Sequence, residues 1–237
     1  MKTRLSNEYK VCLAENIASI RQRMERAGEK GKGQDVTLLC ATKTVPADVI
    51  NYVIREHGIT DIGENRVQEL LEKYDELELE GVNLHFIGSL QTNKVKYIID
   101  KVCMIHSLDS LRLAREIDRQ AKKIGKVMDV LVEVNIGEEE NKGGIMPSEL
   151  ETFLDEISAF DSIRVRGLMT IAPNCERNED YYKYFEKTYQ FFIDILPKKI
   201  HNIYSPILSM GMSDSFETAI GCGSNLIRLG TVIFGQR

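Results

Sequence analysis

The sequence has no long apolar segment. No stretch approaches the roughly 18 uninterrupted apolar residues of a transmembrane helix, although 43% of the 237 residues are hydrophobic. Residues 1–34 carry charges throughout and lack the apolar core of a secretory signal peptide. We therefore expect a cytoplasmic protein that does not associate with membranes.

An excess of positive charge is also missing. The formal net charge is −5 and the isoelectric point is about 5.5, whereas nucleic-acid binding favours a clustered basic face. The five cysteines are far apart and form no C-x-x-C pair, and the four histidines are scattered without ligand spacing. We therefore predict no nucleic-acid partner, no disulfide framework and no metal site.

Short apolar segments alternate regularly with amphipathic ones along the chain. After a predicted helix over 7–28, eight candidate strands follow at 36–41, 61–64, 84–89, 103–108, 129–135, 164–171, 206–211 and 226–230. Uniform alternation of strands and helices implies a parallel sheet, and eight units in about 200 residues fit a closed barrel. No G-x-G-x-x-G motif follows the first strand, which disfavours a dinucleotide-binding fold. We predict one α/β domain over 1–237, a (β/α)8 TIM barrel.

The segments between the strands have helical patterns. They cover 46–58, 66–81, 109–125, 147–160, 180–197 and 213–223, with a brief helix within 90–98. Asp109 is expected to cap the third of these segments, and Ser213 or Asp214 the last.

The ends of the predicted strands carry the candidate functional residues, because active sites of such barrels lie at the carboxyl ends of the strands. Lys43 follows the first strand, and the loops at 209–213 and 228–231 combine glycine with hydroxyl residues. Loops after the seventh and eighth strands commonly bind phosphate. A lysine beside a phosphate site suits a phosphorylated aldehyde cofactor. The alternatives remain open here: strand-end lysines are usually surface residues, and Gly-Ser loops are often simple turns.

A set of motifs in this order resembles the pyridoxal phosphate homeostasis protein family, which is related to the N-terminal barrel of alanine racemase. They are ATKTVP (41–46), IGENRVQEL (62–70), LHFIGSLQTNKVK (84–96), VNIGEEENKGG (134–144), RGLMTIAP (166–173), LSMGMSDSFETAI (208–220) and IRLGTVIFG (227–235). Together they run along nearly the whole chain. The resemblance implies a barrel of the alanine racemase N-terminal type.

The resemblance also implies a cofactor site. Lys43 matches the lysine that carries pyridoxal 5′-phosphate (PLP) as an internal aldimine, Arg228 the arginine that faces the pyridine nitrogen, and Asn65 a residue that lines the ring. The residues implied to hold the phosphate are Ser209, Met210, Gly211, Gly230 and Thr231. Lys94 and Lys142 also match family lysines, either as secondary cofactor sites or as solvated loop residues.

Arg228 bears on whether the resemblance implies an enzyme. An arginine cannot accept a proton at neutral pH, so it leaves the pyridine ring a weak electron sink. Related racemases compensate with a lysine and a tyrosine as paired bases, and the tyrosine comes from a second domain. The sequence ends at IFGQR after the eighth strand, so we expect that second base to be missing.

The expected role is therefore a monomeric, non-catalytic PLP-binding protein of PLP homeostasis, with apo PLP-dependent enzymes as potential recipients. The alternative is a PLP-dependent amino-acid racemase or a related small PLP enzyme.

Overall fold

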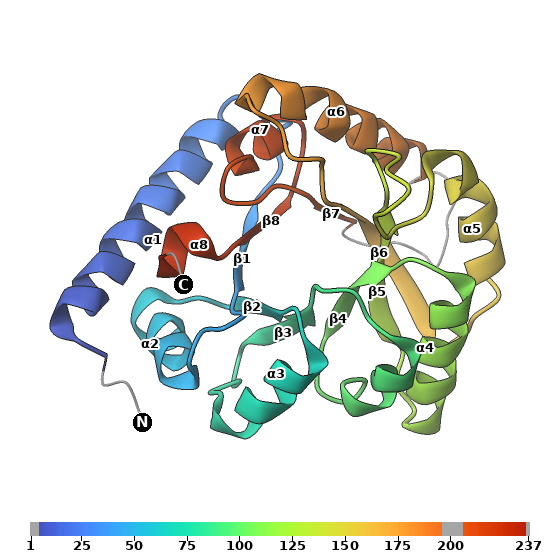
Figure 1. Ribbon diagram of the computed structural model, residues 1–237, viewed down its shortest axis with the longest axis horizontal. Coiled ribbons are helices and arrows are strands. Elements are labelled where there is room, and N and C mark those ends of the chain that lie inside the picture. Colours follow the sequence, from blue (N-terminus) through green and yellow to red (C-terminus); the bar gives the residue numbers. More distant parts are fainter. Residues whose placement is uncertain (1–4, 196–205, 236–237) are drawn as a thin grey trace.

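Eight parallel strands close into a barrel in chain order, with helices around the outside (Figure 1). The computed structural model describes residues 5–195 and 206–235. Every predicted strand is confirmed, and β1 pairs with β8 to close the barrel. The strands are β1 (Thr37–Ala41), β2 (Asp61–Glu64), β3 (Asn83–Phe86), β4 (Met104–Leu108), β5 (Met128–Val134), β6 (Ile163–Thr170), β7 (Ile207–Ser209) and β8 (Leu226–Leu229).

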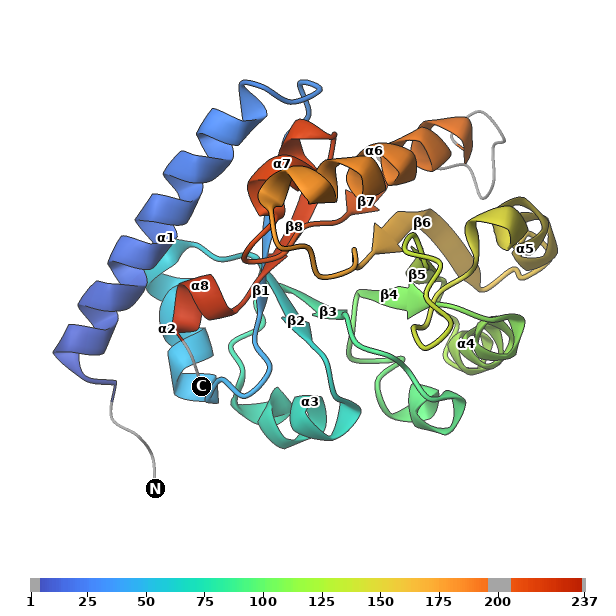
Figure 2. The same ribbon diagram turned by 45° about the horizontal axis from the view of Figure 1, so that its top comes forward.

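The helices form a ring around the strands, which Figure 2 shows from a tilted direction. The α-helices are α1 (Asn7–Gly28), α2 (Ala47–His57), α3 (Val67–Lys73), α4 (Leu111–Lys123), α5 (Leu150–Ile157), α6 (Asn178–Ile195), α7 (Phe216–Gly221) and α8 (Thr231–Phe234). Short 3-10 helices are η1 (Tyr74–Glu76), η2 (Thr92–Tyr97) and η3 (Pro147–Glu149). The predicted first helix and the brief helix within 90–98 are confirmed. The last two residues of the segment predicted at 180–197 lie outside the described residues.

Three helix predictions need correction. Ser110, not Asp109, caps α4, because its hydroxyl accepts the backbone N–H of Leu113 at 3.3 Å. The helix predicted over 66–81 ends as α3 at Lys73 and continues only as the short η1. The helix predicted from 213 begins at Phe216, since residues 213–215 form a turn in which the Ser215 hydroxyl accepts the backbone N–H of Met212 at 3.2 Å.

Inside the barrel, apolar side chains surround a polar centre. One buried cluster contains Leu39, Ile87 and Leu226, and a second contains Met104, Leu131 and Met169. The polar centre consists of His85, His106, Ser209 and Arg228, all buried. It lies between two openings, which we call the carboxyl mouth and the amino mouth after the strand ends that surround them.

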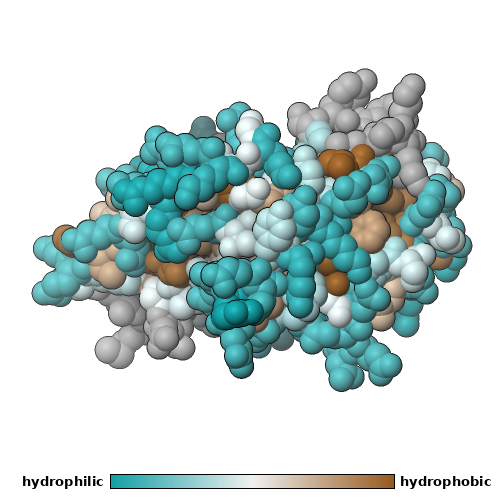
Figure 3. Space-filling model, turned by 90° about the horizontal axis from the view of Figure 1, so that it is seen from above, coloured by the Kyte–Doolittle hydropathy of each residue, from teal (hydrophilic) through white to brown (hydrophobic). Residues whose placement is uncertain are grey.

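The outer surface is mostly hydrophilic on the face seen in Figure 3, with apolar residues dispersed among polar ones. Over the described residues, none of the helices combines the length and apolar character needed to cross a membrane.

Candidate functional site

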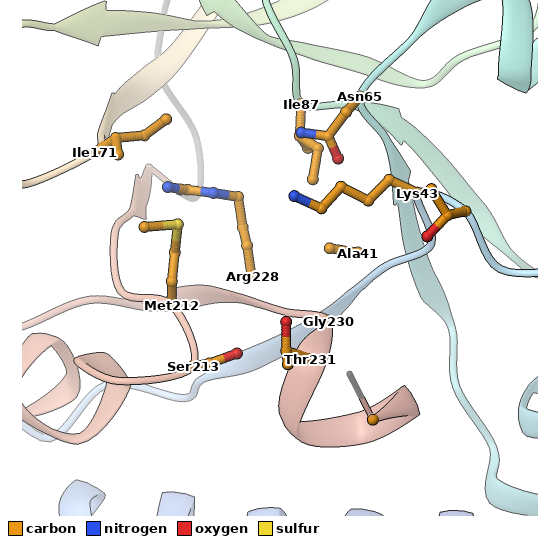
Figure 4. A pocket seen from close by; sticks show the side chains of 12 residues that line it. Ala41, Lys43, Asn65, Ile87, Ile171, Met212, Ser213, Arg228, Gly230 and Thr231 are labelled. Atoms are coloured by element: carbon orange, nitrogen blue, oxygen red, sulfur yellow. The ribbon is translucent and has the colours of Figure 1, made fainter. Parts of the chain in front are cut away.

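A cavity of about 540 Å³ opens at the carboxyl mouth, a volume typical of small-molecule sites. Residues from the loops after β1, β2, β3, β6, β7 and β8 converge on it (Figure 4). The lining residues are Ala41, Lys43, Thr44, Asn65, Ile87, Ile171, Met212, Ser213, Arg228, Gly230, Thr231 and Gly235. Five of the eight predicted site residues are therefore brought together around one cavity.

Lys43 projects into this cavity from a tight turn after β1. The turn is closed by the backbone N–H of Val45, which donates to the carbonyl of Thr42 at 3.0 Å. Thr44 adopts a left-handed conformation with φ of 61°, which is costly for a β-branched residue and persists only where its surroundings enforce it. The exposed Lys43 side chain points toward Arg228 (Figure 4). The local backbone thus directs the amine into the cavity.

A buried ion-pair network supports this turn from behind. The ammonium of Lys73 donates to the carbonyl of Thr42 at 3.0 Å, to Glu64 at 2.9 Å and to Glu69 at 2.8 Å. The carboxylate of Glu69 in turn accepts the backbone N–H of Thr44. Burial raises the pKa of Glu64, and its hydrogen bonds from Lys73 and from the hydroxyl of Thr42 act in the opposite direction. The network ties β1, β2 and α3 together directly beneath Lys43.

Arg228 forms the floor of the cavity and is only 5% exposed. Its guanidinium donates to the carbonyl of Ser209 at 2.9 Å, to the Ser209 hydroxyl at 2.6 Å and to the carbonyl of Thr170 at 3.0 Å. Burial lowers the pKa of Arg228 to about 10, an effect that Glu133 opposes. Arg228 is therefore still a cation at neutral pH and acts only as a hydrogen-bond donor.

Glu133 on β5 is a second ionisable group near this floor. Burial, reinforced by Asp109, raises the pKa of Glu133 to about 7, and Arg228 acts in the opposite direction. Sequence reasoning missed Glu133, because nothing in the strand pattern separates an inward-facing glutamate from an edge residue.

Asn65 presents an unsatisfied amide to the cavity. Its Oδ1 is buried and has no hydrogen-bond partner among the described residues. A β-carbon on Gly88 would lie 2.1 Å from the carbonyl oxygen of Asn65, so only glycine allows the loops after β2 and β3 to approach this closely. Buried polar atoms are normally paired, which makes Asn65 a natural position for a ligand contact.

The loops after β7 and β8 form the remaining wall. Gly230 and Thr231, two of the residues expected to hold the phosphate, line the cavity together with Ser213 and Met212. The other three predicted residues do not line it. Ser209 lies beneath Arg228, whereas Met210 is fully buried in the hydrophobic core.

Gly211 is the third predicted residue away from the cavity wall. It has φ of 97°, and a β-carbon there would lie 2.6 Å from the β-carbon of Ala219. The chain therefore turns tightly against α7 at this position. Because β7 already ends at Ser209, it is the residues after this turn that reach the cavity.

Apolar side chains at the rim were not predicted. Ile171 and Met212 are 40% and 38% exposed, and both line the opening with Ile87. An isoleucine directly after the end of β6 was the available signal, since apolar residues at such positions often contact ligands. Lys94 and Lys142 are not among the residues that line the cavity.

Metal binding finds no support in the described residues. Within 5–195 and 206–235, the histidine, cysteine, aspartate and glutamate side chains include no group of three or more placed to hold a metal ion. His85 and His106 are nevertheless not scattered as the sequence suggested, because the barrel brings their rings to 3.0 Å between nitrogen atoms.

Comparisons with known proteins agree with this architecture. The family model for the alanine racemase N-terminal domain matches residues 13–237. The pyridoxal phosphate homeostasis protein of Aquifex aeolicus is 44% identical over 225 residues, covering 94% of this chain and 97% of that protein. The protein of the same name from Escherichia coli is 36% identical over 231 residues, covering 95% and 97%. Both relatives are named as homeostasis proteins, not as enzymes.

A solved structure extends the comparison to three dimensions. PipY of Synechococcus elongatus, solved with PLP bound, superimposes with a TM-score of 0.81 at 31% identity, covering 94% of this chain and all of the PipY chain. The fold, the family model and these full-length similarities lead to one conclusion: the chain belongs to the pyridoxal phosphate homeostasis protein family, built on the barrel of the alanine racemase N-terminal domain.

Proposed function

We propose that this chain binds pyridoxal 5′-phosphate in the cavity at the carboxyl mouth and holds it covalently, as an aldimine on Lys43. The observation that carries the proposal is the convergence of an amine, a buried guanidinium and an unpaired amide oxygen on one cavity. The names of the relatives and the PLP in PipY support the same ligand.

Each part of the cofactor has a chemically suitable group in the cavity. The amine of Lys43 can attack the aldehyde carbon with loss of water, forming a carbon–nitrogen double bond. Arg228 can donate to the pyridine nitrogen, and Asn65 Oδ1 can accept from the ring hydroxyl. Ser213, Gly230 and Thr231 supply hydroxyl and backbone N–H donors of the kind that phosphate needs.

The charge of the cavity also favours binding of the phosphate group. Lys43 and Arg228 are the charged residues among the cavity-lining set in the described part of the chain, and both are cationic types. In a chain with net charge −5, two cations around one opening favour an anionic ligand over the rest of the surface.

The same residues argue for a carrier without catalysis. PLP acts as an electron sink most strongly when its ring nitrogen is protonated, and Arg228, being a donor, does not supply that proton. Among the described residues that line the cavity there is one lysine and neither a tyrosine nor a histidine. A reaction at an amino-acid Cα needs a second base on the opposite face, and this lining does not provide one.

The exposure of Lys43 supports reversible loading. Its side chain lies in an open cavity at the barrel surface, where water and small amines reach it. We infer a role in PLP homeostasis, in which the chain takes up free PLP and releases it to apo PLP-dependent enzymes.

Visible absorption spectroscopy tests the proposal. Protein reconstituted with PLP and dialysed should retain an aldimine band that borohydride abolishes. Loss of all colour on dialysis would overturn covalent binding. Solvent deuterium incorporation at Cα across a panel of amino acids separates the carrier from a racemase: we expect none above the rate with free PLP, and rapid incorporation would favour an enzyme.

A further inference from the structure

No carboxylate among the described residues contacts the buried guanidinium of Arg228, although a buried charge is normally paired. Its guanidinium donates to two backbone carbonyls and to the hydroxyl of Ser209. Neutral acceptors alone compensate a buried cation poorly. Glu133 acts on Arg228 as an opposite charge, but its pKa of about 7 leaves it only partly ionised at neutral pH. A further counter-charge lies deeper in the barrel.

A row of polar side chains leads from Arg228 through the barrel to its amino mouth. The Ser209 hydroxyl lies 3.4 Å from Nδ1 of His106, and Nε2 of His106 lies 3.0 Å from Nδ1 of His85. Nε2 of His85 then lies 3.1 Å from Oδ1 of Asp61. The row joins β8, β7, β4, β3 and β2 in space, and it ends at a carboxylate.

The two ends determine how every hydrogen in this row is oriented. Arg228 can only donate, so the Ser209 oxygen accepts from it and its single hydrogen points to Nδ1 of His106. A neutral His106 then carries its hydrogen on Nε2 and donates to Nδ1 of His85. His85 likewise donates from Nε2 to Asp61, which as a carboxylate can only accept. All four hydrogen bonds run in one direction, from cation to anion.

The charge states of His106 and Asp61 agree with this arrangement. Burial, together with His85 and Arg228, holds the pKa of His106 well below its usual value, which keeps the ring neutral. Burial alone would raise the pKa of Asp61, but hydrogen bonds from His85, Thr60 and Asn83 outweigh it and the pKa lies below its usual value. Asp61 is accordingly ionised at neutral pH.

We propose that Ser209, His106, His85 and Asp61 form a positioning network that supplies a second, more distant counter-charge to Arg228 and orients its guanidinium toward the cofactor ring. Aligned hydrogen bonds polarise one another in a low-dielectric interior, so the negative charge of Asp61 is felt at Arg228 although the two do not touch. The proposal rests on the proposed function in one respect, that the ring of the bound cofactor lies at Arg228.

The lower end of the network is accessible from the amino mouth. A second cavity of about 380 Å³ opens there, and both Asp61 and His85 line it. Asp35, Asp129 and Arg166 line the same cavity, and Glu133 is the further charged neighbour of Arg228. A change at Asp61 is therefore expected to alter cofactor binding at the opposite mouth of the barrel.

Ring-nitrogen NMR of the apo protein tests the network without any cofactor. At pH 8 we expect both His85 and His106 to be Nε2–H tautomers. A hydrogen on Nδ1 of either ring, or an equal mixture of tautomers, would overturn the proposal even if the protein binds PLP as an aldimine on Lys43.

Matched variants test the effect on the cofactor. Asp61→Asn removes the charge at the end of the network, whereas Asp35→Asn removes the same charge from the same mouth outside it. We expect Asp61→Asn to weaken PLP retention roughly tenfold, the equivalent of one hydrogen bond to a charged group, and to shift the visible band. Asp35→Asn should match wild type. Equal retention and an unchanged band in both variants would contradict the network while leaving the Lys43 anchor intact.

A further variant, His106→Asn, keeps the test independent of Asp61 and of folding defects. His106→Asn keeps an atom near Nδ1 for Ser209 but loses the link to His85, and its fold can be checked by circular dichroism before loading. We expect it to show the same band shift as Asp61→Asn. A folded His106→Asn protein with the wild-type band would overturn the proposal.

Discussion

The two mouths of the barrel use charge in opposite ways. At the carboxyl mouth, Lys43 and Arg228 face one cavity with no carboxylate among its described lining residues. At the amino mouth, Asp129 is held by Arg164 at 2.5 Å and by Arg166 at 2.7 Å. The carboxyl mouth thus brings two cationic side chains to one cavity, whereas at the amino mouth Asp129 is held in two ion pairs.

We therefore assign ligand binding to the carboxyl mouth and a contribution to stability to the ion pairs of the amino mouth. Ion pairs from Arg164 and Arg166 to the largely buried Asp129 tie β5 to β6 at the amino mouth, so removing this carboxylate breaks both ion pairs at once. The carboxyl mouth instead keeps an unsatisfied amide on Asn65 and a left-handed Thr44, features that cost stability and are retained at functional sites. We therefore expect substitutions at the two mouths to affect different measurements.

The largest effect is expected from Lys43→Ala at the carboxyl mouth. Removing the amine removes the only proposed point of covalent attachment, so borohydride should fix no cofactor in the dialysed variant. Lys94→Ala is the control, because Lys94 does not line the cavity. Equal fixation in Lys43→Ala and wild type would place the anchor on another lysine.

Glu133→Gln should change the pH dependence of stability. The folded-state pKa of about 7 lies above the ordinary value of 4.5, so between these values the folded protein holds a proton that the unfolded chain has lost. The free energy of unfolding should thus fall as pH rises through this range, by on the order of 3 kcal/mol. The variant should lack this slope and be more stable than wild type at pH 8.

Denaturant unfolding between pH 4.5 and 8 measures the effect of Glu133. Glu140→Gln, which changes an exposed side chain on the following loop, should keep the wild-type slope. A slope that survives in Glu133→Gln would show that another group is responsible.

Asp129→Asn should affect stability without affecting the ligand. It breaks the ion pairs of Asp129 with Arg164 and Arg166, and because Arg164 is half exposed we expect a loss of about 2 kcal/mol. The absorption spectrum of the loaded protein should stay unchanged. A shifted band without a stability loss would contradict the separation of the two mouths.

Asn65→Ala should produce the smallest effects, of opposite sign in the two measurements. Deleting a buried atom without a partner should raise apo stability by up to about 1 kcal/mol, while cofactor retention falls a few-fold. Denaturant unfolding of the apo protein and dialysis of the loaded protein measure the two effects. A loss of both apo stability and cofactor retention would mean that Asn65 stabilises the fold and does not serve primarily as a ligand contact.

Much of this arrangement followed from the sequence, because strand period and strand ends are local properties. The alternation of apolar segments located all eight strands, and strand ends singled out Lys43 after β1 and the loop at 228–231 at the end of β8. The role of Arg228 within that loop came from the family resemblance. The contacts that the sequence did not predict are those between residues far apart along the chain.

The contact between His85 and His106 illustrates that limit. It depends on β3 and β4 pairing with His85 opposite Met104, which places His106, two residues further, on the same inward face. Met212 and Ser213 line the cavity, whereas Met210 and Gly211 do not. This difference arises because β7 is short and the turn after it packs against α7. Neither register nor such a turn can be read from composition or spacing.

Peptide mapping of the borohydride-reduced, PLP-loaded protein tests the central claim most directly. Mass spectrometry should find the reduced cofactor on the peptide that contains Lys43 and on no other. An adduct on Lys94 or Lys142 instead, or reduced protein that carries no adduct, would contradict the account.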